Sequence, residues 1–251
     1  MKTLLIIAGT DSSGGAGLTR DTATATTLGL QVKPVVTAVT AQSNGALHHC
    51  HPVPVAAVQA QFTAAFRDRP PDAVKIGMLA SADIVDAVAD MLTDHPLPGV
   101  LDPVLRSSSG GVLLADEGLQ PLFPLVSLLT PNLDESATLT GRSFADTTSE
   151  IRHQAARLRA SGASAVLIKG GHGTGTTCTD HLFRSTGQTA ISAPRLPQTR
   201  RGTGCTLATA IACYLAQGRT LEHACRLARR HVQDWLAGDG PDRSHPPRGL
   251  C

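Results

Sequence analysis

The chain of 251 residues has few aromatic side chains: one Trp, one Tyr and five Phe. Its formal net charge is only +2. Proteins that bind nucleic acid usually offer a basic surface or aromatic platforms on which bases stack. Because this sequence has neither, we expect no nucleic-acid partner. It also has no apolar run near the roughly 20 residues that a membrane helix needs, so we expect no membrane segment.

Paired cysteines and common cofactor fingerprints are absent as well. The six cysteines include no CxxC pair, and a chain of this length can bury a core without disulfides. The first residues, MKTLLIIAGTDSSGG, reach glycines too early for a signal peptide. We therefore expect a cytoplasmic protein. The glycine loop after the first predicted strand is not a GxGxxG fingerprint, and no GxxxxGK[ST] phosphate loop occurs.

Short apolar runs alternate with helical patterns along the chain. Six runs have the length and β-branched content of buried strands: residues 4–9, 33–41, 72–79, 99–104, 127–132 and 164–171. Repeated strand–helix units predict one α/β domain of three layers, with a mostly parallel central sheet covered by helices on both faces. We expect this domain to span residues 1–237, followed by a Pro- and Gly-rich tail over residues 238–251.

Local signals mark where several elements start. Ser81 can cap a helix that begins after it, Thr147 with Glu150 has the spacing of a capping box, and Thr220 can cap the last helix. The segment 176–196 alternates polar and apolar residues, which predicts a β-hairpin at the edge of the sheet.

Ligands bind beyond the carboxyl ends of parallel strands, and most polar clusters of this sequence follow predicted strands. The first strand leads into a glycine loop, GTDSSGGAGLTRD, which contains Asp11 and Asp21. Gln42 follows the second strand. Its amide donates and accepts hydrogen bonds together, which suits a heterocycle with a ring nitrogen beside an amino group. Turn geometry and a solvated loop are the alternatives for these residues.

Three later strands end in groups that suit phosphate chemistry. Asp102, Asn132 and Glu135 offer oxygens of the kind that Mg²⁺ prefers, although each could instead cap a helix or turn. Lys169 is followed by glycines, so its ammonium could reach a phosphate.

The stretch Gly202, Thr203, Gly204 and Cys205 precedes an apolar helix, and we call it the anion hole. Backbone amides and the helix dipole favour an anion there. In the same field the Cys205 thiol is predicted to have a lowered pKa and to be a partial thiolate near neutral pH. A small core residue is the alternative for Cys205. Together these groups predict phosphoryl transfer.

Seven motifs occur in order over roughly the first 237 residues: IAGTDSSGGAGLTRD, VTAVTAQ, AVKIGMLAS, LDPVL, LLTPNLDES, VLIKGGH and GTGCTLATAIA. In these motifs the chain resembles the hydroxymethylpyrimidine and phosphomethylpyrimidine kinases of thiamine biosynthesis, members of the ribokinase-like superfamily. The resemblance implies a ribokinase-like fold and a homodimer. It also implies Mg²⁺- and ATP-dependent phosphorylation of the hydroxymethyl oxygen of 4-amino-5-hydroxymethyl-2-methylpyrimidine, often followed by a second phosphorylation to the diphosphate.

The resemblance also assigns site residues. The pyrimidine site of the family corresponds to Gly9, Asp21, Gln42, Met78 and Val104 of this sequence. Its phosphate-handling groups fall on Asn132, Glu135 and Lys169, with Asp102 nearby and Glu135 as the candidate Mg²⁺ ligand. Its anion hole falls on Gly202 to Cys205, and Cys205 becomes the candidate base where many relatives of the superfamily have aspartate.

Two departures from the family pattern add positive charge. Relatives usually resemble NTHGTGC before the anion hole, whereas this chain reads QTRRGTGC, so that Arg201 replaces a histidine beside Arg200. After DPVL the chain has Arg106 and a serine run. One hypothesis is that one of these arginines holds the phosphate of the monophosphate substrate, and solvated arginines on a loop are the alternative.

Three other functions are alternatives to this one. A pyridoxal or pyridoxine kinase of the same superfamily could share the sheet, the anion hole and the cysteine. A pyrimidine-binding protein without activity would need no phosphate machinery. A cysteine hydrolase is disfavoured because no histidine has an evident place beside Cys205.

Overall fold

The computed structural model describes residues 1–105, 118–171 and 175–238. Its centre is an eight-stranded sheet in the order β10-β9-β8-β7-β6-β5-β1-β2. The strands are β1 (Thr3–Ala8), β2 (Gln31–Val36), β5 (Ala73–Ile76), β6 (Gly99–Leu101), β7 (Leu128–Leu129), β8 (Val166–Ile168), β9 (Thr177–Arg184) and β10 (Gly187–Pro194). Neighbours from β2 to β8 are parallel, whereas β9 and β10 are antiparallel to their neighbours. The predicted mostly parallel sheet is therefore confirmed.

The central strands are buried on both faces, which explains their continuous apolar runs. In β1, Leu5 and Ile7 pack into one hydrophobic core, and Leu4 and Ile6 pack into a second core on the opposite face. All four side chains are fully buried.

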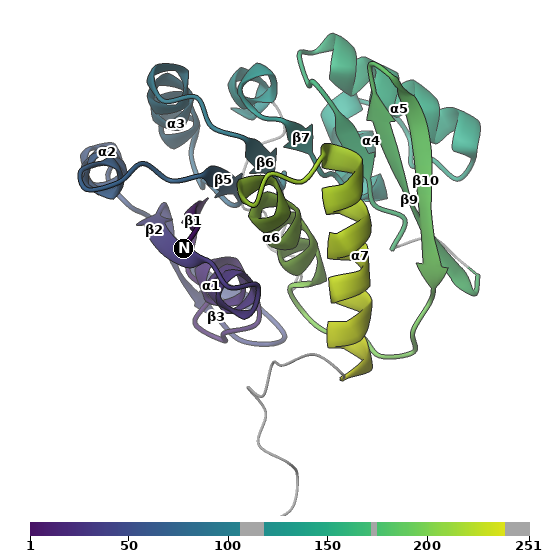
Figure 1. Ribbon diagram of the computed structural model, residues 1–251, viewed down its shortest axis with the longest axis horizontal. Coiled ribbons are helices and arrows are strands. Elements are labelled where there is room, and N and C mark those ends of the chain that lie inside the picture. Colours follow the sequence, from purple (N-terminus) through teal and green to yellow (C-terminus); the bar gives the residue numbers. More distant parts are fainter. Residues whose placement is uncertain (106–117, 172–174, 239–251) are drawn as a thin grey trace, which may run out of the picture.

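Helices cover both faces of the sheet (Figure 1). The core around Leu5 is completed by residues of α2 (Val55–Phe66), α3 (Ala82–Asp94), the 3₁₀ helix η2 (Gln120–Leu125), α4 (Leu133–Thr140) and α5 (Thr148–Ala160). The core around Leu4 is completed by α1 (Gly17–Thr27), α6 (Thr203–Ala216) and α7 (Leu221–Ala237). The three-layer architecture is thus confirmed. The helices in the described ranges are too short or too polar to cross a bilayer.

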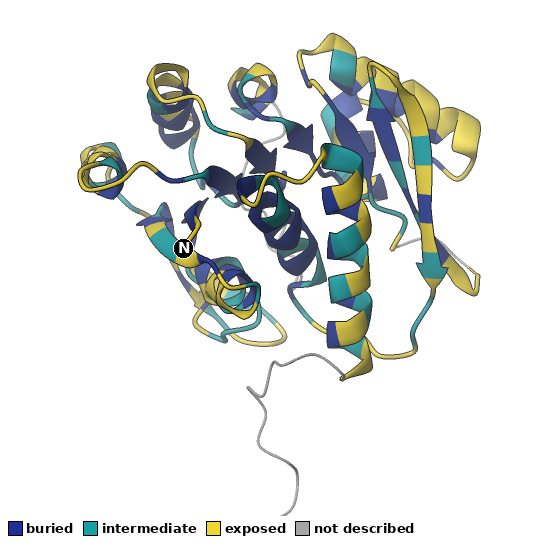
Figure 2. Ribbon diagram, in the orientation of Figure 1, coloured by how far each residue is buried: buried dark blue, intermediate teal, exposed yellow. Residues whose placement is uncertain are grey.

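The most buried of these helices is α6, which carries the anion hole at its start. It packs against the sheet and between α1 and α7 (Figures 1 and 2). Small and apolar residues fill it from Thr206 to Cys213, all of them buried. A helix fixed on several sides gives the groups at its N-terminus a rigid support.

Most of the predicted start signals are confirmed. The Ser81 hydroxyl accepts a hydrogen bond from the backbone of Ile84, and Thr147 and Glu150 form the predicted capping box. Thr220 does occupy the N-cap position of α7, but its side chain makes no capping hydrogen bond there. The predicted hairpin over 176–196 is formed by β9 and β10. Of the predicted tail, residues 238–251, only Gly238 lies within the described residues, as the C-cap of α7.

One predicted strand is wrong. The run 33–41 divides at Thr37 into β2 and β3 (Ala38–Gln42), and β3 pairs with β4 (Leu47–Pro52) in a separate two-stranded antiparallel sheet. The division is fixed by Thr37, whose amide donates to the carbonyl of Ala8 and whose hydroxyl donates to the carbonyl of Met78. Gln42 therefore lies on a hairpin beside the central sheet and not at the end of one of its strands.

Candidate active site

A pocket opens where the chain changes direction across the sheet. β1 and β5 are neighbours, but the chain continues from β1 to β2 on one side and from β5 to β6 on the other, so the connections that leave β1 and β5 diverge at their carboxyl ends. Such a switch point is the usual ligand site of an open α/β sheet. The pocket is lined by Ala8, Gly9, Thr10, Asp11, Ala16, Gly17, Thr40, Gln42, Lys75, Met78, Val104, Arg201 and Cys205. The structure thus brings four of the five predicted pyrimidine-site residues together with the candidate base.

The glycine loop reaches the pocket because its backbone folds tightly. Gly17 has a φ of 58°, and a side chain there would collide with the carbonyl oxygen of Gly9. That same carbonyl accepts the amide of Leu18, which fixes the start of α1 beneath the loop. A glycine is therefore required at position 17.

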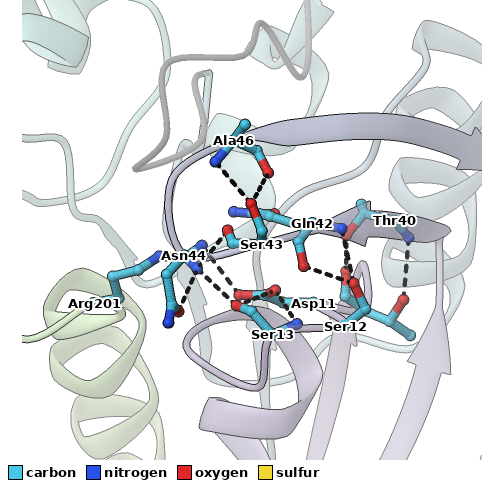
Figure 3. A network of polar contacts seen from close by, with 10 residues as sticks. Asp11, Ser12, Ser13, Thr40, Gln42, Ser43, Asn44, Ala46 and Arg201 are labelled. Carbon is cyan, nitrogen blue, oxygen red and sulfur yellow. Dashed lines mark hydrogen bonds and ion pairs between the residues drawn. The ribbon is translucent and has the colours of Figure 1, made fainter.

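Arg201 fastens the glycine loop to the β3–β4 turn (Figure 3). Its guanidinium lies 3.2 Å from the Asp11 carboxylate, and it donates to the Ser13 hydroxyl at 2.6 Å and to the carbonyl of Ser43 at 3.1 Å. The Ser12 hydroxyl in turn joins the loop to the backbone of Gln42. These contacts hold Gln42 at the pocket.

The three arginines that depart from the family pattern have different surroundings. Arg201 lines the pocket. The Arg200 guanidinium lies 5.3 Å from the ring of Trp235, which Arg20 also approaches, at 4.8 Å. Arg200 is therefore engaged with α7. Arg106 lies outside the described residues.

A second group of polar residues surrounds Lys169, directly after β8. Its ammonium donates to the Asp102 carboxylate at 2.7 Å and lies 3.8 Å from Glu135 Oε2. Glu135 and Asn132 also form a capping box: the Asn132 side chain accepts the amide of Glu135, and Glu135 accepts the amide of Asn132. The alternative of helix capping is thus realised for this pair, while Glu135 still faces Lys169.

Burial and charge together set the protonation of this cluster. Burial raises the pKa of Glu135 to about 7, although Lys169 acts in the opposite direction. Burial also raises the pKa of Asp102, but the ammonium groups of Lys169 and Lys75 outweigh it and hold that pKa below its ordinary value. Asp102 is therefore ionised beside a charged Lys169 at neutral pH.

The anion hole meets the Lys169 cluster at Gly204. Gly202 caps α6 with a φ of 77°, and Thr203 begins the helix. A β-carbon built on Gly204 would lie 3.3 Å from the Lys169 ammonium and 3.7 Å from the Asp102 carboxylate. The missing side chain thus lets a lysine approach the first turn of α6, where the helix dipole already favours negative charge.

Cys205 does not have the lowered pKa that its place at a helix N-terminus predicts. Burial raises the pKa of the Cys205 thiol to about 11, although Lys75 and a hydrogen bond from the backbone of Gly17 act in the opposite direction. Removal of the thiolate from water therefore outweighs both of these stabilising contacts. The prediction of a partial thiolate is wrong for the protein without ligands.

Asp21 and Lys75 form a buried ion pair that the sequence did not reveal. Asp21 is absent from the pocket lining; its carboxylate accepts the Lys75 ammonium at 2.6 Å and the Thr209 hydroxyl at 2.8 Å. A lone lysine in the apolar run AVKIGML was the available signal, because lysine is almost never fully buried unless it is paired. The assignment of Asp21 to direct substrate contact is corrected: it holds Lys75, which lines the pocket.

Within the described ranges, no three His, Cys, Asp or Glu side chains gather as metal ligands. Among the described residues, the carboxylates of Asp102 and Glu135 meet the Lys169 ammonium beside the first turn of α6. Mg²⁺ in phosphoryl transfer usually takes one or two carboxylates, several waters and the oxygens of the phosphates themselves. The two carboxylates fit a site of that kind and not a closed metal cage.

Comparison with known proteins agrees with this geometry. A family model described as phosphomethylpyrimidine kinase matches residues 11–245. The chain belongs to the phosphomethylpyrimidine kinase family. Over 243 residues it is 42% identical to the hydroxymethylpyrimidine/phosphomethylpyrimidine kinase of Streptomyces coelicolor, with 95% of this chain and 90% of that protein covered. The family resemblance seen in the motifs and the expectation of a kinase are therefore confirmed.

Solved structures of kinases share the fold. Phosphomethylpyrimidine kinase from Clostridium difficile superposes with a TM-score of 0.81 at 32% identity, covering 94% of this chain and 100% of that chain. The pyridoxal kinase of Bacillus subtilis, solved as an ADP complex, superposes with a TM-score of 0.84 at 29% identity, covering 93% of this chain and 90% of that chain. The ribokinase-like fold expected for the phosphomethylpyrimidine kinase family is thus confirmed.

Proposed function

We propose that the protein transfers the γ-phosphoryl group of ATP to the hydroxymethyl oxygen of 4-amino-5-hydroxymethyl-2-methylpyrimidine, and then phosphorylates the monophosphate to the diphosphate. The observation that carries this proposal is one pocket in which Gln42, Met78 and Val104 meet Cys205 at the start of α6. A heterocycle seated there has a polar amide on one side and apolar side chains around it. Its hydroxymethyl group then faces the anion hole.

Gln42 supplies recognition of the ring. Its amide both donates and accepts, which matches an aminopyrimidine edge that carries an amino group beside a ring nitrogen. Arg201 and Ser12 hold the hairpin that bears Gln42, so the amide is positioned before the substrate arrives. This arrangement favours an aminopyrimidine over a ring that lacks that edge.

Phosphoryl transfer itself takes place at the anion hole. The oxygen of the hydroxymethyl group bonds to the γ-phosphorus, and the bond from that phosphorus to the bridging oxygen of ADP breaks. The hydroxyl proton passes to the sulfur of Cys205, which accepts it in the thiolate form and becomes a neutral thiol. The amides of the first turn of α6 and the Lys169 ammonium stabilise the charge that the phosphoryl oxygens carry in the transition state. The proton then leaves the thiol for water.

ATP is the phosphoryl donor in this proposal, in keeping with the ADP complex of the related pyridoxal kinase. Mg²⁺, when bound with ATP, supplies positive charge that neutralises the phosphate oxygens. Glu135 and Asp102 are the residues that would hold it, directly or through water. Both carboxylates are held in place by Lys169, which keeps the cluster near electrical balance while no nucleotide is bound.

A product assay tests the proposal directly. The protein is incubated with ATP, Mg²⁺ and the hydroxymethylpyrimidine, and the monophosphate and diphosphate are resolved over time. Successive appearance of the two products is expected. Binding of the pyrimidine without any consumption of ATP would contradict the proposal and would favour a binding protein.

The candidate base has its own test. Cys205→Ala is expected to lower kcat by roughly 10²–10⁴, the usual share of a general base, with little change in ATP binding. Cys213→Ala on the same helix is the matched control, because Cys213 is fully buried and is not among the residues that line the pocket. Full kcat in Cys205→Ala would show that Cys205 is a core residue only.

A pyridoxal kinase is the second candidate, because a pyridoxal kinase shares the fold at a TM-score of 0.84. Turnover of pyridoxal and of the hydroxymethylpyrimidine, compared at equal concentrations, separates the two. A homodimer and a cytoplasmic location stay predictions, and light scattering of the purified protein tests the first.

A further inference from the structure

Lys75 is a charged side chain that lines the pocket, and it is not among the groups assigned above to phosphoryl transfer, which are Cys205, Lys169 and the first-turn amides of α6. It lies in β5, an interior strand of the sheet between β6 and β1, and only 1% of its surface is exposed. It nevertheless lines the same pocket as Cys205. Its ammonium is 2.6 Å from the Asp21 carboxylate, which lies on α1 and is 0% exposed.

Asp21 is in turn tied to the helix that carries Cys205. The Thr209 hydroxyl donates to Asp21 at 2.8 Å. Residues 205 and 209 are one helical turn apart, so their side chains lie on the same face of α6. Lys75, Asp21 and Thr209 therefore form a buried chain of contacts from the sheet, through α1, to the face of α6 on which Cys205 lies.

The two charges of the pair do not cancel at Cys205. Of the charged groups near Cys205, Lys75 has the largest effect on the pKa of the thiol and favours the thiolate. Asp21 has the next largest effect and disfavours the thiolate. This order agrees with the placement, because Lys75 lines the pocket and Asp21 lies behind it. The charged and titratable groups that act on the sulfur from the surrounding elements are Lys75, Lys169, Asp21 and Asp102.

We propose that Lys75 is a positioning residue for phosphoryl transfer: held by Asp21, its ammonium stabilises the negative charge on the Cys205 sulfur as that sulfur takes part in proton transfer from the substrate hydroxyl. The role of Cys205 in this statement rests on the proposed function. The electrostatic action of Lys75 on Cys205 does not, and it is measurable without turnover.

The test removes the pair without leaving an unpaired buried charge. Lys75→Met is combined with Asp21→Asn, and a second variant, Lys75→Gln with Asp21→Asn, keeps a possible hydrogen bond between two neutral side chains. The rate of alkylation of Cys205 by iodoacetamide is followed against pH by peptide mass spectrometry. Because only the thiolate reacts, this profile reports the titration of Cys205. Lys2→Met with Asp72→Asn is the matched control, because it removes a surface lysine–aspartate pair whose separation of 2.7 Å is close to the 2.6 Å of the pocket pair.

Both pocket variants are expected to shift the profile of Cys205 upward by about one pH unit, which is about a tenfold lower alkylation rate at any pH below the midpoint. The kcat for the pyrimidine is expected to fall about tenfold, while the KM for ATP stays within twofold. The control keeps the wild-type profile. An unshifted Cys205 profile in the pocket variants would overturn the proposal and leave the pair a purely structural one. A wild-type protein that consumes no ATP with the pyrimidine would instead contradict the proposed function alone.

Discussion

Lys75 lies in β5 and Lys169 directly follows β8 of the same sheet, and each pairs with an aspartate, yet their surroundings differ. The Lys75–Asp21 pair is sealed, with 1% and 0% of the two side chains exposed. Lys169 is 12% exposed, shares two carboxylates and faces the first turn of α6. The buried Lys75 ammonium keeps Asp21 as its partner and acts on the pocket as a fixed positive charge. The Lys169 ammonium can leave a carboxylate and bind a phosphate of the substrate instead. The difference assigns them different tasks in one reaction.

The largest effect is expected from breaking the sealed pair on one side. Lys75→Met leaves the Asp21 carboxylate buried without its cation, which typically costs about 3–5 kcal/mol of stability. Lys169→Met is expected to cost less, since its ammonium is more exposed. Urea unfolding of both variants measures the difference. Equal losses would remove the distinction between a sealed and an open lysine.

The next largest effect is on activity, for which Lys169 is expected to matter more than Lys75. Lys169→Met is expected to lower kcat by roughly 10²–10³, the cost of one group that stabilises transition-state charge. Lys2→Met, at a surface lysine, is the control and keeps the wild-type kcat. Single-turnover rates at saturating ATP make the measurement. A change in KM alone would mean that Lys169 binds ATP without acting on the transition state.

The two cysteines of α6 sharpen the comparison further. Burial raises the pKa of Cys205 to about 11 and of Cys213 to about 12, against 9.0 for an ordinary thiol. Because each pKa is higher in the folded protein than in the unfolded chain, each buried thiol makes its full contribution to the free energy of unfolding below pH 9. That contribution is lost as the pH rises above 9, because the unfolded chain releases these protons first. The loss approaches about 1.4 kcal/mol per pH unit for each thiol.

Urea unfolding near pH 8 and near pH 10 measures that loss. Cys213→Ala is expected to make the difference between the two pH values smaller than in the wild type. The reverse result, a larger difference in the variant, would show that Cys213 does not titrate as its burial requires.

The smallest effect is expected at Arg201. If it holds the phosphate of the monophosphate substrate, Arg201→Ala lowers the second phosphorylation about tenfold more than the first, because only the second substrate carries that phosphate. The effect is small because the guanidinium must give up its contact with Asp11 to bind the phosphate. Arg200→Ala is the matched control, since Arg200 is engaged with Trp235. Equal losses in both steps would mean that Arg201 only fastens the glycine loop to the β3–β4 turn.

The sequence predicted the central sheet well because its strands are buried on both faces and read as unbroken apolar runs. It did not predict β4, whose residues LHHCHP are mostly exposed and have no apolar periodicity. Without that partner, the apolar pattern of residues 33–41 predicts one continuous strand where the structure has β2 and β3. The place of Gln42 on a separate hairpin follows from pairing between strands, which the local pattern does not contain.

The sequence predicted only part of the site, because the local pattern contains backbone geometry and not the contacts between distant residues. Glycines and strand ends located the pocket and the anion hole, since those positions follow from backbone geometry. The Lys75–Asp21 pair joins residues 54 positions apart in the chain and was missed. The pKa of Cys205 was predicted in the wrong direction, because the helix dipole can be read from the sequence and the extent of burial cannot.

The stacking of Arg200 on Trp235 has an optical consequence. Trp235 is the only tryptophan of the chain, and the arginine above its ring is joined through Arg201 to the first residue of the anion hole. Indole emission depends on nearby charge and on contact with water. Any displacement of this arginine when nucleotide or pyrimidine binds therefore changes the emission of a single fluorophore, so the protein carries its own reporter for ligand titrations.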